Sequence, residues 1–146
     1  MAESPGMNDW TRLCELLDDD PELLPAVRLA VAGDEDPWTA LIDGLDDAGA
    51  LAYLEVNDTG IELADALPPL PRVFATGVEL DKVGDVEGDL TAAIVRADSL
   101  LASRDLRIVY LDEDSDAYPL VVVPIANVAE ILEITERLGF TARIFP

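Results

Sequence analysis

Residues 106–124, LRIVYLDEDSDAYPLVVVP, constrain the fold of this chain more than any other stretch of its sequence. Two apolar, β-branched runs flank a short acidic turn, which is the pattern of an antiparallel β-hairpin. Several carboxylates also converge here beside an apolar surface. We expect a central structural hairpin with alternating strands that feed the core. Asp and Ser side chains are expected to form its turn by hydrogen bonds to their own backbone.

Three helices are predicted before the first strand. Over residues 8–17, and again after Asp36, apolar side chains recur at steps of three, one and three. This is the spacing of an amphipathic helix. Asn8 or Asp9 is the expected N-cap of the first helix, and Asp36 that of the third. Together these helices would form a helical layer over residues 1–49.

The middle helix has two alternative starts because of Pro25. A proline inside a helix removes a backbone hydrogen bond. Either a short turn covers residues 21–24, or the helix begins at Pro25. Both alternatives make residues 27–32 helical and end the helix at Gly33.

After residue 50 the predicted elements alternate between strands and helices. Pro68, Pro69 and Pro71 are expected to exclude regular structure where they stand, and the structure of 68–85 is left open, with two short extended pieces as candidates. The other predicted elements are a strand over 51–56, helices over 61–67 and 85–103, the hairpin, a helix from Asn127 as N-cap to Leu138, and a strand over 140–145.

This order, βαββαβ, matches the ferredoxin-like topology. Right-handed crossovers would place both helices on one face of a four-stranded antiparallel sheet. The N-terminal helices would then cover an end of this layer or the other face. We expect a single α+β domain over 1–146, with a helical part (1–49) and an α+β part (50–146). The alternative is a different α+β sandwich in which residues 72–83 supply a fifth strand.

The chain is strongly acidic, with 31 Asp and Glu against nine Lys and Arg and a net charge of −22. A field of this sign repels nucleic-acid phosphates and anionic lipids, so neither is an expected partner. No apolar run reaches the roughly 18 residues of a membrane span, and no secretory signal is visible, which makes the cytoplasm the expected location. The acidity fits either surface solvation in a high-salt cytoplasm or a binding surface for a basic protein.

Residue types that are missing exclude several chemistries. The chain contains no histidine, so Ser-His-Asp and Cys-His catalysis and His-based zinc sites are ruled out. Cys14 is the only cysteine and falls among apolar helix positions, where a lone cysteine is usually a small core residue. No glycine-rich phosphate loop is present. We assign no catalytic residue, metal ligand or cofactor.

The candidate binding surface is the acidic turn of the hairpin. Its D-x-D-x-D run resembles the start of an EF-hand loop, but Ala117 and Val123 stand where that loop needs glycine and glutamate. A tyrosine in such a strand could donate a hydrogen bond to a ligand, although packing with a wet tip is the commoner role. The candidate residues are Asp112, Asp114, Asp116 and Tyr118.

The C-terminal forty residues resemble the end of a bacterial domain-of-unknown-function family, number 6630. Proteins of that family carry a strand, an acidic S-D-x-Y turn, an aliphatic strand ending in proline, and a helix ending at Leu-Gly. The matching positions here are Ser115, Asp116, Tyr118, Pro124, Leu138 and Gly139. Pro119 departs from the pattern and would disturb strand pairing unless its strand lies at an edge or is just leaving the turn. The resemblance covers about a quarter of the chain and implies no established activity.

Three classes of function remain. The acidic composition favours a non-enzymatic cytoplasmic domain for protein interaction or regulation, with a basic partner attracted by charge. The alternative is a sensor that binds a small ligand or a divalent cation in a pocket between the sheet and the N-terminal helices. A carboxylate-dependent enzyme is the third class, and it would require a perturbed carboxylate in a cleft. The oligomeric state is left open.

Overall fold

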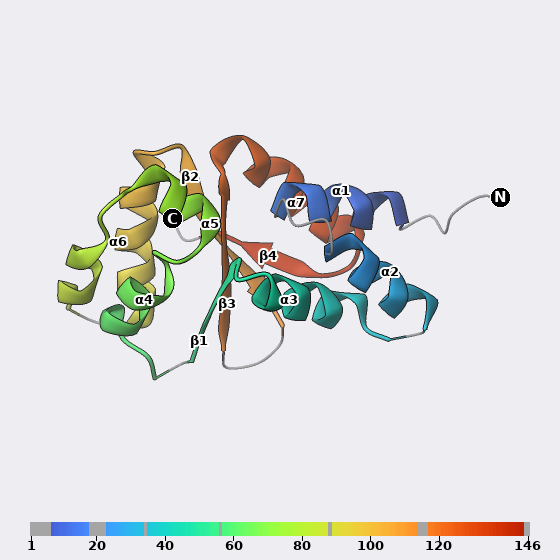
Figure 1. The fold of residues 1–146 in the computed structure, drawn as a ribbon, viewed down its shortest axis with the longest axis horizontal. Coiled ribbons are helices and arrows are strands. Elements are labelled where there is room, and N and C mark those ends of the chain that lie inside the picture. Colours follow the sequence, from blue (N-terminus) through green and yellow to red (C-terminus); the bar gives the residue numbers. More distant parts are fainter. Residues whose placement is uncertain are drawn as a thin grey trace.

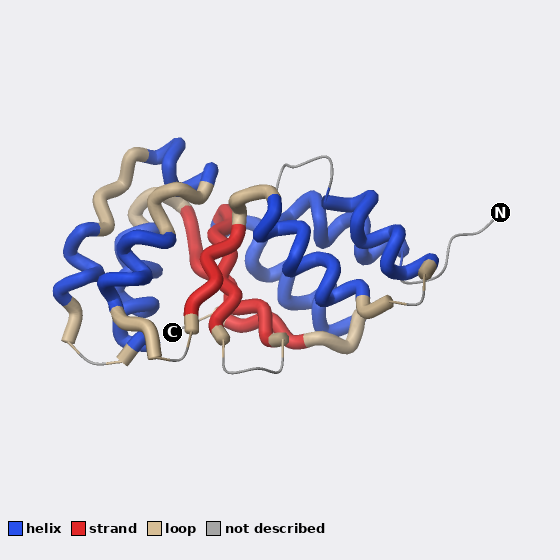
Figure 2. Tube along the Cα trace, turned by 60° about the horizontal axis from the view of Figure 1, so that its bottom comes forward, coloured by secondary structure: helices blue, strands red, loops and turns tan. Residues whose placement is uncertain are grey.

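The computed structural model describes residues 7–17, 23–33, 35–55, 57–87, 89–113 and 117–144. In these residues an antiparallel sheet lies between two groups of helices (Figures 1 and 2). The elements are α1 (Met7–Leu17), α2 (Leu23–Ala32), α3 (Pro37–Asp47), β1 (Leu51–Leu54), α4 (Gly60–Ala66), α5 (Pro71–Thr76), the 3-10 helix η1 (Asp81–Asp85), α6 (Leu90–Ala102), β2 (Leu106–Asp112), β3 (Tyr118–Pro124), α7 (Ile125–Arg137) and β4 (Thr141–Arg143).

Local capping signals explain where several helices begin. Asp36 caps α3 as predicted, because its carboxylate accepts a hydrogen bond from Trp38 N at 3.1 Å. Thr59 and Glu62 form a reciprocal capping box at the start of α4. The N-caps predicted for α1 were wrong: the helix already begins at Met7, so Asn8 and Asp9 lie within its first turn.

Three further helix starts differ from the prediction. The helix predicted over 85–103 is α6, which begins at Leu90 with Asp89 as its N-cap. The middle helix, α2, begins at Leu23, so both predicted alternatives were wrong, although its end at Ala32 was predicted. Pro25 is tolerated because backbone N–H groups in the first turn have no partner within the helix. Similarly, α7 begins at Ile125 and takes Asn127 into its first turn. Its predicted end is confirmed by Gly139, whose φ of 85° suits glycine.

The prediction that Pro71 excludes regular structure was also wrong. Pro71 is the first residue of α5, where a proline is favoured because its fixed φ suits the helix and its missing N–H is not needed. Of the two candidate extended pieces, residues 73–75 are part of α5, and residues 78–80 have no regular structure and precede the 3-10 helix η1. No strand occurs within described residues 57–87, so the alternative fold with a fifth strand over 72–83 is excluded.

The order of the strands corrects the ferredoxin-like prediction. The sheet has the order β1-β3-β2-β4, and all its neighbouring strands are antiparallel. The first three strands lie as that topology requires. The last strand, β4, pairs with β2, with Tyr110 opposite Arg143, whereas a ferredoxin-like sheet would place it beside β1.

The position of β4 determines on which face of the sheet α6 and α7 lie. The β1-to-β2 and β3-to-β4 connections each cross one strand and step in the same direction across the sheet, but β1 and β3 run in opposite directions. Two crossovers of the same hand must then place their helices on opposite faces. Accordingly, α6 covers one face and α7 the other, so the prediction that both helices share one face was wrong.

Each face of the sheet therefore has its own hydrophobic core. The core around Leu13, Leu41 and Ile131 joins α1, α2, α3 and α7 to one face of the sheet. The other core joins α4, α5, η1 and α6 to the opposite face. Successive strand residues alternate between the two. Val109, Leu111, Val121 and Val123 belong to the first core, and Ile108, Tyr110, Leu120 and Val122 to the second.

The hairpin of β2 and β3 is confirmed as the centre of the sheet. Its two strands pair from Leu106 opposite Pro124 to Tyr110 opposite Leu120. Pro119 lies one residue beyond that last pair, next to the turn, so its missing N–H interrupts no pair with β2.

Among the described residues, no helix is long and apolar enough to cross a membrane.

Candidate functional site

The structure places two of the four candidate residues of the acidic turn. Asp112 ends β2 and Tyr118 begins β3, at the base of the turn. Asp114 and Asp116 lie outside the described residues. The hydrogen bonds predicted within the turn therefore stay a prediction.

Asp112 is engaged by two other elements. Its Oδ2 accepts a hydrogen bond from Arg143 of β4 at 3.2 Å, and its carbonyl oxygen accepts one from Trp38 Nε1 of α3 at 2.8 Å. Arg143 also lies over the ring of Tyr110, with 5.3 Å between the guanidinium carbon and the ring centroid. The Asp112 carboxylate thus already has a cationic partner from its own chain.

Tyr118 packs against Tyr110, and their ring centroids are 5.5 Å apart. Burial, with a smaller contribution from the charge of Asp112, raises the pKa of Tyr110 above its ordinary value. Tyr110 is therefore neutral near pH 7. Asp112, Tyr118, Tyr110 and Arg143 form a packed group that joins β2, β3 and β4.

The opposite side of the turn is held by β1. Glu113 accepts a hydrogen bond at Oε1 from the hydroxyl of Tyr53, which lies in that edge strand. Contacts from α3, β1 and β4 thus converge on the last residues before the turn. Within the described part of the chain, no group of three or more Asp, Glu, Cys or His side chains is placed to hold a metal ion.

A second acidic site, which the sequence analysis did not identify, lies between α2 and α3. It is a pocket of about 480 Å³ with small residues and carboxylates around it. The two helices approach closely because Gly44 has no side chain: a Cβ there would lie 2.8 Å from Leu23 Cδ1. The pocket is lined by Ala26, Glu35, Asp36, Thr39, Ala40, Asp43, Gly44 and Asp47.

The carboxylates of this pocket differ in their partners. Asp36 is occupied as the N-cap of α3 and also accepts a hydrogen bond from Thr39 Oγ1 at 2.9 Å. Within the described residues, the side chains of Glu35, Asp43 and Asp47 have neither a hydrogen bond nor an ion pair. A cation that entered the pocket would meet carboxylates that have no partner among the residues the structure describes.

A sequence signal for this pocket existed. Asp36, Ala40, Asp43 and Asp47 follow one another at steps of four, three and four. Such residues share one helix face, opposite the buried face of Trp38, Leu41 and Leu45. The apolar spacing predicts the helix, and the position of Asp36, Asp43 and Asp47 on its opposite face could have predicted an acidic surface there.

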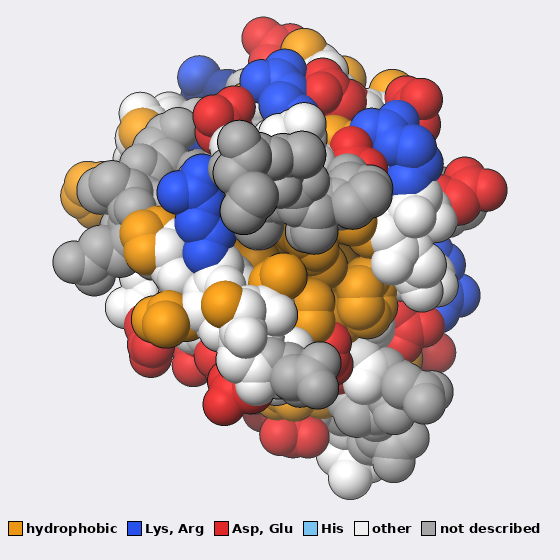
Figure 3. All heavy atoms as spheres, turned by 90° about the vertical axis from the view of Figure 1, so that its right-hand side faces the viewer, with side chains coloured by type: hydrophobic (Ala, Val, Ile, Leu, Met, Phe, Trp, Pro, Cys, Tyr) orange, Lys and Arg blue, Asp and Glu red, His pale blue; other side chains and the backbone are white. Residues whose placement is uncertain are grey.

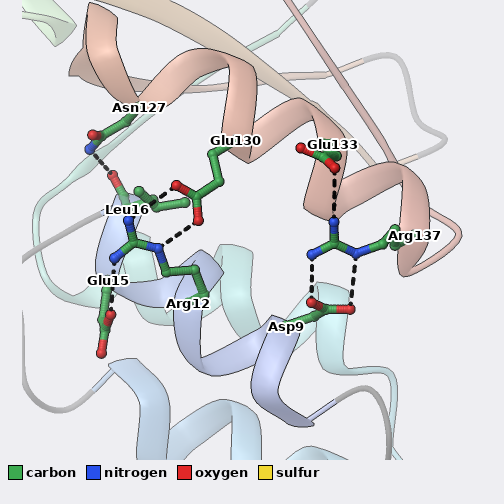
Figure 4. Close-up of polar contacts among 8 residues, drawn as sticks. All are labelled: Asp9, Arg12, Glu15, Leu16, Asn127, Glu130, Glu133 and Arg137. Atoms are coloured by element: carbon green, nitrogen blue, oxygen red, sulfur yellow. Dashed lines mark hydrogen bonds and ion pairs between the residues drawn. The ribbon is translucent and has the colours of Figure 1, made fainter.

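Most of the described basic side chains that could neutralise carboxylates are used within the fold. Figure 4 shows the largest group, at the contact of α1 with α7: Arg12 pairs with Glu130 at 2.6 Å, and Arg137 pairs with Asp9 at 2.7 Å. Hydrogen bonds from these arginines hold the pKa values of Glu130 and Asp9 below their usual range.

Three more arginines bind groups elsewhere in the chain. Arg107 pairs with Asp98, and Arg143 pairs with Asp112. Arg72 donates to the carbonyl oxygens of Leu16 and Leu17, at 3.2 and 3.0 Å. Figure 3 shows a related arrangement on one face of the molecule, where the basic side chains lie mostly in its upper part, beside acidic ones. At least five of the nine basic side chains thus hold parts of the fold together.

Cys14 is buried, as predicted, on the inner face of α1. Burial raises the pKa of its thiol to about 12, so the reactive thiolate is scarce near pH 7. The cysteine therefore contributes to the core and adds no nucleophile to either acidic site.

Comparison with known proteins gives one match. The sequence model of a family described as "Domain of unknown function (DUF6630)" matches residues 9–145. The resemblance predicted for the last quarter of the chain therefore extends over almost all of it. No curated protein and no solved structure matches. This chain belongs to the DUF6630 family.

Proposed function

We propose that this chain is a non-enzymatic cytoplasmic domain for protein interaction or regulation, which binds a basic protein partner through its acidic surface. The α2–α3 pocket is the observation that carries the proposal. Glu35, Asp43 and Asp47 line it without a partner among the described residues. A lysine or arginine from another protein would supply the charge that this chain does not.

The distribution of charge supports the same proposal. At least five of the nine basic residues donate to carboxylates or carbonyl oxygens within the fold. The net charge of −22 is therefore carried largely by outward-facing acids. Such a field speeds the approach of a positively charged protein and disfavours nucleic acids and anionic membranes. Because α3 holds its carboxylates at fixed positions, a basic partner binds well only if its positive groups lie opposite them.

The hairpin site gives less support to an enzyme. The carboxylate of Asp112 is paired with Arg143, and burial keeps Tyr110 in its neutral form. The carboxylate is thus engaged within the fold, and the phenol, whose pKa is raised by burial, gives up its proton less readily than an exposed tyrosine.

The volume of the pocket favours one second candidate, a sensor for a small cationic ligand. Pockets for small molecules commonly span about 300–1,000 Å³, and the α2–α3 pocket, at about 480 Å³, lies in this range. No three acidic side chains of the described residues converge as metal ligands do. An organic cation, whose charge is spread over several atoms, therefore fits this pocket better than a divalent metal ion.

The test measures binding of a defined probe, a peptide of alternating arginine and serine, by isothermal titration calorimetry. The informative variant is D43N/D47N, which removes two carboxylates from the pocket. We expect it to weaken binding by about three- to tenfold, because an exposed ion pair contributes about 0.2–1 kcal/mol. Added salt should reduce the difference between the two proteins, because it screens exposed charges.

The matched control is D46N/D65N, which removes two exposed carboxylates that do not line the pocket. Both variants change the net charge from −22 to −20, so a non-specific field would weaken binding by the same factor in each. Equal weakening, or no measurable binding to the wild-type protein, would contradict the proposal. A control peptide with glutamine in place of arginine should not bind. The second candidate, a sensor for a small cation, is tested with spermidine, which should raise the Tm of the protein if it binds the folded state.

A further inference from the structure

We draw no further inference here: the strongest candidate, the apolar side chains gathered at the centre of the face that Figure 3 shows, carries no proposal because nothing in the structure shows what covers them.

Discussion

Asp98 and Arg107 form a partly buried ion pair that fastens α6 to β2. Arg107 Nε donates to Asp98 Oδ2 at 2.8 Å, and the neighbouring Ile108 N donates to Asp98 Oδ1, also at 2.8 Å. The Asp98 side chain is only 7% exposed. One carboxylate thus satisfies both a charged group and a backbone N–H beneath a helix. Its removal would leave both of these donors without their acceptor.

We expect Asp98→Ala to lower the free energy of unfolding by about 3 kcal/mol, because a lost hydrogen bond to a charged group costs about 1.5–3 kcal/mol and a buried unpaired donor adds about 1–3 kcal/mol. Urea unfolding followed by circular dichroism measures this change. The control is Asp65→Ala, an exposed residue of α4 that should change stability by less than about 0.5 kcal/mol. A loss below about 1 kcal/mol for Asp98→Ala would show that the pair is not structurally important.

The end of α1 supplies a test of shared hydrogen bonding. The carbonyl oxygen of Leu16 accepts from Asn127 Nδ2 at 3.1 Å and from Arg72 at 3.2 Å. We expect Asn127→Ala to cost about 1 kcal/mol, since Arg72 still satisfies the carbonyl. The double variant R72A/N127A should lose more than the sum of the two single variants, because the carbonyl then has neither donor. Strict additivity in urea unfolding would refute this coupling.

Cys14 gives a chemical measure of how firmly α1 is held. A thiol pKa of about 12 leaves about 10⁻⁴ of it as thiolate at pH 8. We therefore expect a disulfide reagent such as DTNB to label the native protein slowly and the urea-unfolded protein within seconds. Because the folded-state pKa is raised, folding stability should fall as pH rises above about 8.5, where the unfolded thiol ionises. Fast native labelling at pH 8 would mean that α1 opens readily.

The ion pairs between α1 and α7 predict a dependence on pH. Arg137 and Arg12 lower the pKa values of Asp9 and Glu130 in the folded state. The stability they contribute is then present above the ordinary carboxyl pKa values of about 4 and is lost as pH falls through the lowered values. We expect R12Q/R137Q to melt below the wild type at pH 7. This gap in Tm should close toward pH 2.

That experiment needs a control for net charge, because the side chains of these ion pairs are exposed to solvent. All four side chains are at least a quarter exposed, so salt should also narrow the gap in Tm. Arg96→Gln/Arg104→Gln removes the same positive charge from exposed positions in and just after α6, which packs on the opposite face of the sheet from α7. If this control variant reproduced both the gap and its loss at low pH, net charge alone would explain the effect.

The helices were predicted well because their signals are local. The spacing of Trp38, Leu41 and Leu45 creates an apolar stripe that must be buried, and Asp36 satisfies a backbone N–H that the helix leaves open. The starts of α2, α6 and α7 were misplaced, and α5 was not predicted. Two of these errors, at α2 and α5, concern a proline. A proline is compatible with a first helical turn as well as with a loop, so Pro25 and Pro71 did not by themselves distinguish the two.

The strands carried a signal that was interpreted too narrowly. Residues 120–123, LVVV, are apolar without interruption, and in the structure they alternate between the two cores. A continuous apolar run indicates a strand that is buried on both faces, whereas a strand with one wet face alternates apolar and polar residues. This run could have predicted helices on both sides of the sheet.

The candidate sites were likewise predictable only in part from the sequence. Asp112 and Tyr118 were identified from the sequence, but the contacts of Arg143 with Asp112 and Tyr110 depend on β4 lying beside β2. The acids of α3 were visible as a periodic set, but a pocket exists only because α2 packs against that helix. Because Gly44 has no side chain, Leu23 of α2 can approach α3 closely, and these two residues are far apart in the sequence.

Local signals in the chain account for the helical stripes, the caps at Asp36 and Thr59, and the central hairpin, because each depends on residues a few positions apart. The edge of the sheet that receives β4 depends instead on long-range packing. The outer edges of β1 and β2 both offer unpaired backbone groups to a further antiparallel strand, so hydrogen bonding does not distinguish them. Packing of α7 and β4 with the core of α1, α2 and α3 distinguishes the two edges, and that packing joins residues more than a hundred positions apart.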